Sequence, residues 1–464
     1  MNLRIWSFTL ILFLSLSAFS QKANKYLVHP LPVSWTEADT VFQQILPIDD
    51  HWWKAFEDPM LDSLISVAVK QNYSVLTAIN RMDMAKANLR IERGSYYPSL
   101  ALSGGWTKQQ TSGNTSSIPQ AKEHYFNAAL STSWEADIFG SIRNRVKAQK
   151  ETFMASQEEY NATMVSLCAQ VASGYINLRQ LQQELDVVKK NCASQEEVLK
   201  ITEVRYNTGL VSKLDVLQAK SVYYSTKASI PTIEAGIIQY INSLAVLLGV
   251  YPADLRPSLE KIGPLPDYME LVSVGIPANL LRRRPDVRGA ERTVNAQAAL
   301  LGASKSDWLP QFFLKGSVGY ASKDMKNFAE KKSLTYEIAP SFTWTLFNGT
   351  KLVNATKLAR AQLDEAINQY NQTVLTAVQE VDNAMSTYQN SIKQIVALRE
   401  VLNQGQQTLK LSLELYKQGL TPFQNVLDAQ RSLLCYEKSL VEAKGNSLLC
   451  LIQMYQALGG GWQE

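Results

Sequence analysis

The sequence contains two similar stretches that decide the fold: YNTGLVSKLDVLQA at residues 206–219 and YKQGLTPFQNVLDA at residues 416–429. Tyr, Gly, Leu, Val, Leu and Ala recur at the same places in both, at a constant offset of 210 residues. Gly209 follows Tyr206 by three residues, and Gly419 follows Tyr416 in the same way. A glycine in this place is typical of a helix that ends in a left-handed residue. Each stretch therefore predicts a tight turn between two helices.

The residues after each glycine predict the start of a second helix. Ser212 and Thr421 are expected to cap that helix, and Pro422 suits its first turn. One such stretch alone is best explained as an ordinary surface turn. Two stretches at a fixed spacing indicate that the whole chain is an internal repeat.

Other parts of the two halves also correspond, such as Ser133-Trp134 with Thr343-Trp344. We therefore expect two copies of one plan, each with a helix, two strands, a long helix, a turn and a return helix. The predicted organisation is a signal peptide at 1–20, an extended segment at 21–58, the first repeat at 59–250, a proline-spaced connection at 251–276 and the second repeat at 277–464.

The start of the chain has the pattern of a secretory signal. Arg4 precedes an apolar run at residues 5–16, and small residues lead to a cleavage site after about Ser20. The run is too short for a spanning helix. No cysteine precedes Cys168, so we expect no lipid anchor on an N-terminal cysteine. Cys168, Cys192, Cys435 and Cys450 have no metal-ligand spacing; we favour small buried residues, while export leaves a disulfide possible.

Four stretches alternate apolar with small or polar residues: 100–107, 126–135, 312–320 and 336–346. This period of two predicts strands with one apolar face. Such strands fit a membrane barrel with a water-filled lumen, and they also fit an ordinary half-buried antiparallel sheet.

Two runs without proline, 140–207 and 348–418, predict very long helices. Each holds roughly 70 residues, which is about 100 Å of continuous helix. Return helices are expected at 214–248 and 423–458, and the mixture of apolar and polar residues favours coiled-coil-like packing.

Four strands cannot close a barrel, and lipid does not tolerate open strand edges. If the strands lie in a membrane, several chains must share one barrel, and three chains would supply 12 strands. The predicted fold class is mainly α with a membrane β-barrel. The long helices would form a hollow α-barrel whose far end carries the Gly209 and Gly419 turns.

At this point the sequence resembles the outer-membrane efflux factors of tripartite pumps, TolC-like and closest to the NodT subgroup. The resemblance rests on WWKAFEDPML at 52–61, WEADIFG at 134–140, IPANLLRRRPDVRGAE at 276–291 and the two turns, and it covers the chain from about residue 50 to its end. It implies a homotrimer with a 12-stranded barrel in the outer membrane of a Gram-negative-type envelope and a helical tunnel into the periplasm. It also implies a passive exit duct that works with a periplasmic adaptor and an inner-membrane efflux pump.

The resemblance also implies roles for residues in the turns. Asn425 and Asp428 match acidic positions that constrict the periplasmic mouth of the tunnel, although Asn425 departs from them by being neutral. Tyr416 and Asp215 match positions whose contacts tie neighbouring coiled coils shut in some members. Thr421 stands where some members carry a basic partner, so the closing network here is expected to be weaker. For each residue alone, a solvated turn position is the alternative.

Nothing in the sequence points to an enzyme, a cofactor or a metal. His29, His51 and His124 are scattered, and no glycine-rich loop follows a strand to hold a phosphate. The net charge of +4 is too small to argue for a nucleic-acid partner. The Arg282–Arg284 run is better explained by ion pairs with acids such as Asp286 and Glu291 than by an anion site. Two other functions stay open: an outer-membrane duct for secreted polypeptides, and a soluble periplasmic coiled-coil scaffold.

Overall fold

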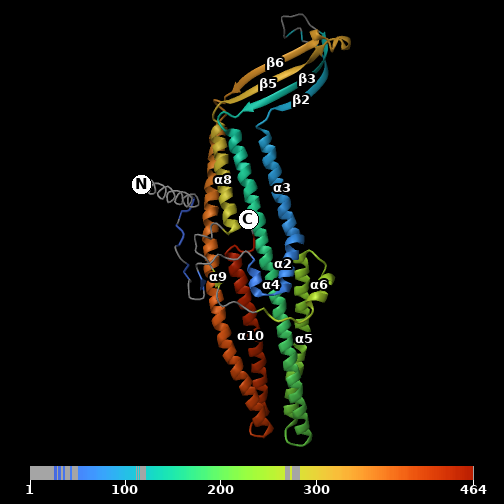
Figure 1. The fold of residues 1–464 in the computed structure, drawn as a ribbon, viewed down its shortest axis with the longest axis vertical. Coiled ribbons are helices and arrows are strands. Elements are labelled where there is room, and N and C mark those ends of the chain that lie inside the picture. Colours follow the sequence, from blue (N-terminus) through green and yellow to red (C-terminus); the bar gives the residue numbers. More distant parts are fainter. Residues whose placement is uncertain are drawn as a thin grey trace, which may run out of the picture. The chain divides into compact units, whose positions relative to one another are not determined.

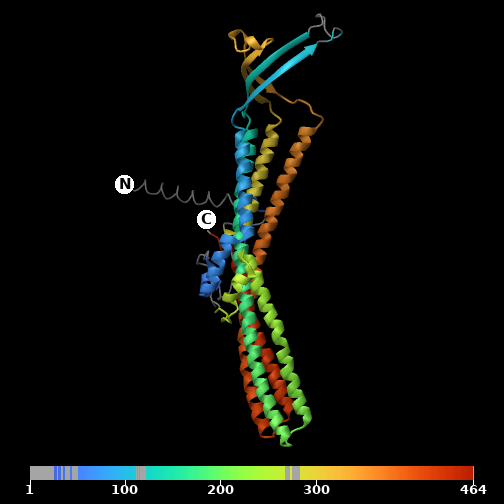
Figure 2. The same ribbon diagram turned by 90° about the vertical axis from the view of Figure 1, so that its right-hand side faces the viewer.

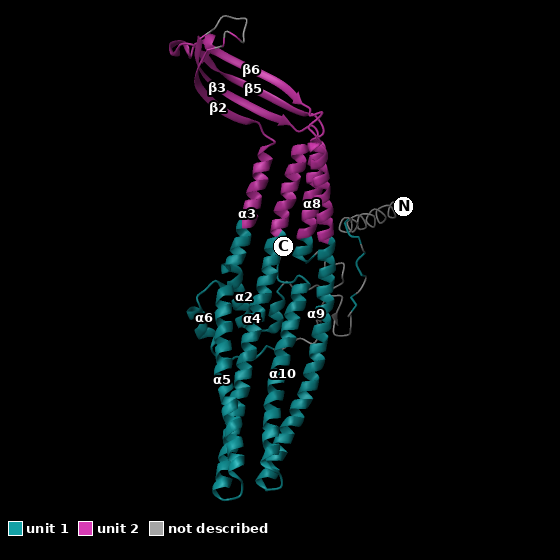
Figure 3. Ribbon diagram, turned by 180° about the vertical axis from the view of Figure 1, so that it is seen from behind, with its two compact units in different colours: residues 1–80, 158–288, 371–464 teal, residues 81–157, 289–370 magenta. Residues whose placement is uncertain are grey.

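The structure is a computed structural model that describes residues 51–110, 122–266 and 283–462, with short pieces at 26–28, 30–32, 35–36, 42–43, 112, 114 and 272–273. The predicted signal peptide, its cleavage site and Arg282 lie outside the described residues. The chain forms two compact units, shown in teal and magenta in Figure 3. Unit 1 holds Met1–Asn80, Glu158–Arg288 and Asn371–Glu464, and unit 2 holds Arg81–Gln157 and Gly289–Tyr370.

The two long helices form as expected. Helices α4 (Ser141–Asn207) and α9 (Lys351–Lys417) contain 67 residues each. Their return helices are α5 (Lys213–Leu248) and α10 (Phe423–Ala457). Without proline, the long runs keep every backbone donor available for the helical ladder. Within unit 1, the α4–α5 turn and the α9–α10 turn lie at the same end in both views (Figures 1 and 2).

Each long helix forms a two-helix coil with its return helix in unit 1. In the first coil, α4 and α5 are joined by ion pairs such as Lys220–Glu203, at 3.0 Å. In the second coil, α9 and α10 share an apolar cluster of Ile395, Leu440 and Ala443. We call these pairs, within unit 1, the first coil and the second coil.

Shorter helices complete the two repeats. They are the 3-10 helix η1 (Trp52–Phe56), α2 (Pro59–Gln71), α3 (Tyr73–Gly94), α6 (Pro252–Leu259) and α8 (Pro285–Ser306). The single helix expected ahead of the strands of the first repeat is wrong, because α2 stops at Asn72 and α3 follows it. There the backbone is extended, and the side-chain oxygen of Asn72 accepts hydrogen bonds from the amides of Ser74 and Val75. Asparagine thus caps a new helix in place of continuing the old one. Of the connection at 251–276, residues 252–259 form α6, and β4 (Val272–Ser273) pairs in parallel with β1 (Phe42–Gln43).

Unit 2 contains an antiparallel sheet of four strands in the order β2-β3-β5-β6. The strands are β2 (Ser99–Gln110), β3 (Lys122–Ala136), β5 (Gln311–Ser322) and β6 (Leu334–Thr343), and short 3-10 helices η2 (Met325–Asn327) and η3 (Lys331–Ser333) connect the last two. All four predicted strands are therefore present. The edge strands β2 and β6 each have a single partner among the strands that the structure describes.

The pairing register places apolar residues of all four strands on one face of this sheet. Leu102 pairs with Leu130, Leu130 with Val318, and Val318 with Tyr336. Leu102 and Tyr336 are 80% and 79% exposed, so the described residues leave much of this face uncovered. The opposite face carries small and polar residues, including Ser103, Ala129, Gly319 and Glu337.

The arginine-rich stretch forms ion pairs in unit 1, as predicted for Arg284 and Asp286. The Arg284 guanidinium lies 2.7 Å from carboxylate oxygens of both Asp286 and Glu380, and it donates to the Ala457 carbonyl. Because only 9% of its side chain is exposed, these contacts are needed to compensate for its lost hydration. The motif thus ties the start of α8 to α9 and to the end of α10.

All four cysteines are free thiols. Cys168 is buried, and burial raises the pKa of its thiol to about 12. Cys435 is exposed, so the expectation of buried cysteines is wrong for this residue. By length and composition α5 alone among the described helices could cross a membrane, but it lies in the first coil, where its apolar residues include the buried Ile241 and Leu244.

Candidate functional site at the turn end of unit 1

The two turns have the same backbone geometry. Gly209 and Gly419 have φ of 76° and 78°, the left-handed conformation that was predicted. In the first turn, the Gly209 amide donates to the Tyr206 carbonyl and the Leu210 amide donates to Arg205, both at 2.9 Å. The second turn repeats this pattern with Gly419 and Leu420 as donors. This pair of bonds is the Schellman motif, which satisfies the last carbonyls of the helix.

The second helix of each turn starts differently. Ser212 is the N-cap of α5 and accepts a hydrogen bond from the Asp215 amide, as predicted. The prediction of Thr421 as the cap of α10 is wrong, because Pro422 occupies the N-cap position and no side chain caps the helix. Pro422 has an extended ψ of 153°, so it precedes the first turn, and the helix starts at Phe423 as expected. Thr421 instead accepts a hydrogen bond from the Asn425 amide group at 2.6 Å.

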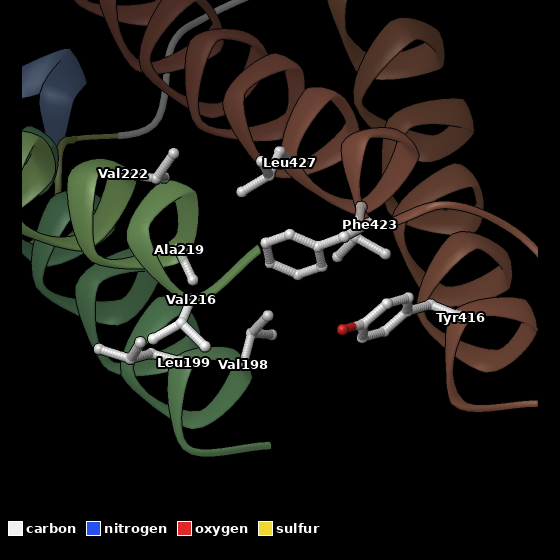
Figure 4. Packing of buried hydrophobic residues seen from close by; sticks show 9 residues of the cluster. Val198, Leu199, Val216, Ala219, Val222, Tyr416, Phe423 and Leu427 are labelled. Atoms are coloured by element: carbon white, nitrogen blue, oxygen red, sulfur yellow. The ribbon is translucent and has the colours of Figure 1, made fainter. Parts of the chain in front are cut away.

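An apolar cluster joins the two coils beside the turns (Figure 4). The first coil contributes residues from α4 and α5, and the second coil contributes residues from α9 and α10. The members are Val198, Leu199, Val216, Ala219, Val222, Tyr416, Phe423, Val426 and Leu427. Burial of this cluster holds the two coils in contact at the turn end.

Tyr416 is the aromatic residue at the edge of this cluster. It is 3% exposed, its ring lies 5.0 Å from that of Phe423, and the Arg205 guanidinium lies 4.9 Å from its centroid. Burial raises the pKa of its hydroxyl; Thr202 and Arg205 oppose this rise, and the negative charge of Asp215 adds to it. The Tyr416 hydroxyl is itself buried, and Thr202 is the side chain that lies within its reach.

Asp215 therefore lies close to Tyr416 without bonding to it. Its carboxylate accepts a hydrogen bond from the Ser212 hydroxyl at 3.2 Å, within its own turn. The structure thus brings together the two residues that the resemblance associates with closure, but it joins them by electrostatic proximity and not by a hydrogen bond.

Asn425 and Asp428 lie on the exposed side of α10, three residues apart and so on one face of the helix. Asp428 accepts a hydrogen bond from the Gln424 side chain at 2.9 Å. Both residues line a groove of about 570 Å³ between α9 and α10, together with Glu400, Gln404 and Tyr436. The lining of the groove is mixed, with Val401, Ala429 and Tyr436 beside the polar side chains, and Glu400 and Asp428 place a carboxylate on each helix. Within the described part of the chain, no group of three or more His, Cys, Asp or Glu residues could hold a metal ion.

Arg205 is a site residue that the sequence reasoning missed. Its Nη1 donates to the Lys417 carbonyl at 2.7 Å, which connects the two turns directly. One signal was available in the sequence: at the offset of 210 residues Arg205 corresponds to Leu415, so the two stretches differ in charge immediately before the tyrosine.

Comparison with known proteins agrees with this architecture. The sequence profile of the family described as outer membrane efflux protein matches residues 64–250 and 276–460, in two separate segments. The probable efflux pump outer membrane protein TtgC of Pseudomonas putida is 28% identical over 442 residues, which cover 94% of this chain and 91% of that protein. Nodulation protein T of Rhizobium leguminosarum bv. trifolii is also 28% identical, over 93% of this chain and 92% of its own length.

Solved structures show the same fold. The outer-membrane channel OprN superposes with a TM-score of 0.89 at 26% identity, covering 94% of this chain and 98% of that one. The outer membrane protein VceC of Vibrio cholerae gives a TM-score of 0.84 at 25% identity, covering 90% and 100%. These likenesses confirm the TolC-like fold and the location in the outer membrane. The chain belongs to the outer membrane efflux protein family.

Proposed function

We propose that this protein is the outer-membrane exit duct of a tripartite efflux system. Three copies would share one 12-stranded barrel, and the duct would passively conduct substrates that an inner-membrane pump delivers through a periplasmic adaptor. Membership in the family supports the efflux role, and the two repeats with their long coils are consistent with it.

The observation that carries the proposal is the sheet of unit 2. One face exposes apolar residues from all four strands, and the edge strands β2 and β6 have free sides in the described chain. Lipid accepts the apolar face but not the free edges, so neighbouring copies must pair with them. A soluble periplasmic scaffold gives no reason for such a face, and this makes that alternative weaker.

We infer the class of transported substrate from the names of the relatives. Among them, one is named an antibiotic efflux pump outer membrane protein and another a toluene efflux pump outer membrane protein, both from Pseudomonas putida. We therefore propose small toxic compounds as the cargo here, in preference to secreted polypeptides.

The mouth of the duct is proposed at the turn end of unit 1. Threefold symmetry would place three copies of Asp428 around one axis, with a neutral ring of Asn425 next to it. A ring of carboxylates attracts cations, so Asp428 would make the mouth favour cation passage.

A matched pair of variants on one strand tests the membrane assignment. Ile338 is 76% exposed on the apolar face of β6, and the neighbouring Glu337 points to the polar face. Ile338→Lys should prevent trimer formation in the outer membrane, because a lysine facing lipid costs about 2–4 kcal/mol at the bilayer midplane. Glu337→Lys should still give trimers that need detergent for extraction. Equal behaviour of both variants, or a monodisperse wild-type monomer without detergent, would refute the proposal.

A further inference from the structure

We propose that Arg205 is the latch that holds the first and second coils together at the turn end of unit 1. It does so through a cation–π contact with the ring of Tyr416 and a hydrogen bond to the carbonyl of Lys417. A hydrogen bond between Tyr416 and Asp215 is not part of this connection. This inference rests on the proposed function, because it assigns the residue that keeps the proposed mouth narrow.

The position of Arg205 is fixed by its own turn. Its backbone carbonyl accepts the Leu210 amide in the Schellman motif, so the α-carbon cannot shift without breaking that turn. From there the side chain reaches across to α9. Nη1 lies 2.7 Å from the Lys417 carbonyl, and the guanidinium carbon lies 4.9 Å from the centre of the Tyr416 ring. One side chain therefore connects the ends of the two long helices.

The chemistry of the contact suits arginine. Lys417 is the last residue of α9, and the final carbonyls of a helix lack partners within it. They also carry partial negative charge, which favours a cation. A planar guanidinium can donate to such a carbonyl and stack on an aromatic ring at the same time, which the ammonium group of lysine cannot do.

The contact has the properties of a latch that can open. It consists of one hydrogen bond and one cation–π contact, and the Nε of Arg205 is buried without a partner among the described residues. An unsatisfied donor makes the closed arrangement less favourable than a fully paired one. The buried apolar cluster also holds the two coils in contact here, so loss of the Arg205 contacts should loosen the turn end without unfolding it.

Thr421 of the second turn takes no part in the contact that Arg205 makes. Its hydroxyl accepts a hydrogen bond from the Asn425 side chain in the first turn of α10, and it brings no positive charge to the turn. Arg205 supplies that charge from the other coil. Its counterpart in the second repeat, Leu415, cannot do so, and this makes the latch one-sided.

Single-channel conductance of the purified protein in planar bilayers tests this role. Arg205→Ala should raise the conductance at least twofold. Arg205→Lys keeps the positive charge but not the planar guanidinium, and it should give an intermediate value. Lys417→Ala is the matched control, because only the backbone carbonyl of Lys417 takes part. Tyr416→Phe keeps the ring and should conduct like the wild type. In the double variant Arg205→Ala with Tyr416→Leu, the increase should not exceed that of the larger single variant.

Hydrogen exchange on the detergent-solubilised protein gives a second readout that does not need a conducting channel. Arg205→Ala should speed amide exchange in the last turns of both α4 and α9, and Lys417→Ala should not. Wild-type conductance and exchange in Arg205→Ala would overturn the latch. Opening by Tyr416→Phe as large as that by Arg205→Ala would overturn it in favour of the hydroxyl. A wild-type protein that fails to conduct would refute the proposed function, and the exchange experiment would then decide on the latch alone.

Discussion

The two turns of unit 1 share a backbone and differ in their surroundings. Both end the preceding helix with a left-handed glycine and the same pair of hydrogen bonds. Yet Tyr206 is 41% exposed, whereas Tyr416 is 3% exposed and lies against Phe423 and Arg205. The repeat therefore preserves the part of the sequence that reverses the chain. The surrounding side chains differ, because Tyr416 packs against the other coil whereas Tyr206 stays exposed to solvent.

The largest difference is expected between the two tyrosines. Tyr416→Ala should lower the free energy of unfolding by about 3 kcal/mol, because truncating a buried aromatic residue leaves a cavity in the cluster. Tyr206→Ala should change it by less than about 0.5 kcal/mol, as is usual for a surface position. Chemical denaturation of the purified protein, followed by circular dichroism, measures both values. Similar losses would show that the turns are equivalent in packing as well as in backbone.

Alanine at either turn glycine should lower the free energy of unfolding by the same amount, because the two turns share one backbone conformation. At Gly209 and Gly419 an added Cβ would meet no atom within 4 Å, so only the left-handed backbone opposes a side chain. Gly209→Ala and Gly419→Ala should each cost about 1–2 kcal/mol. Gly94 at the end of α3 has equally open surroundings without a positive φ. There alanine should be neutral or stabilise by up to about 1 kcal/mol, since it favours the helix. Thermal unfolding of the three variants compares them, and a loss at Gly94 as large as at the turns would contradict this explanation.

The shared features of the turns are also those that could be read from the sequence. Tyr-x-x-Gly determines a local conformation, and the absence of proline over long runs determines helix length, so α4, α5, α9 and α10 are found where expected. The strands followed from their alternation of apolar and small residues, which continues in the pairing register. The profile match in two segments agrees with a repeated chain, but the detailed boundaries at residues 59–250 and 277–464 stay predictions.

The features that escaped prediction depend on contacts between distant parts of the chain or on a choice between local alternatives. Arg205 and Lys417 are 212 residues apart, so no local pattern could show their hydrogen bond. The break at Asn72 depends on a side chain that either continues a helix or caps the next one. At Pro422 the N-cap position moved by one residue, because proline tolerates the extended backbone needed there.

A smaller difference in the free energy of unfolding is expected between Ser212 and Thr421, which precede α5 and α10. Ser212→Ala removes the side-chain acceptor for the Asp215 amide and should cost about 1 kcal/mol. Thr421→Ala should cost less than about 0.5 kcal/mol, because Thr421 accepts from an exposed side chain and caps no backbone amide. The midpoints of denaturant unfolding at equal slope give both values. If Thr421→Ala costs as much as Ser212→Ala, the two helices start in the same way in solution.

The smallest effect on stability, and a distinct effect on transport, is expected at Asp428. Its side chain is exposed and accepts a hydrogen bond from Gln424 on the same helix, so Asp428→Asn should change the free energy of unfolding by less than about 0.5 kcal/mol. The first turn offers no such position, because the carboxylate of Asp215 is engaged by Ser212. If three copies of Asp428 surround the mouth, removing their charge should reduce the preference for cations roughly twofold, as expected for a charged ring in a pore. Asn425→Asp is the matched opposite change: it adds a ring of charge one helical turn away and should increase that preference. Reversal potentials in planar bilayers under a salt gradient measure both variants. Unchanged selectivity in Asp428→Asn, with the trimer intact, would make Asp428 an ordinary solvated residue of its turn.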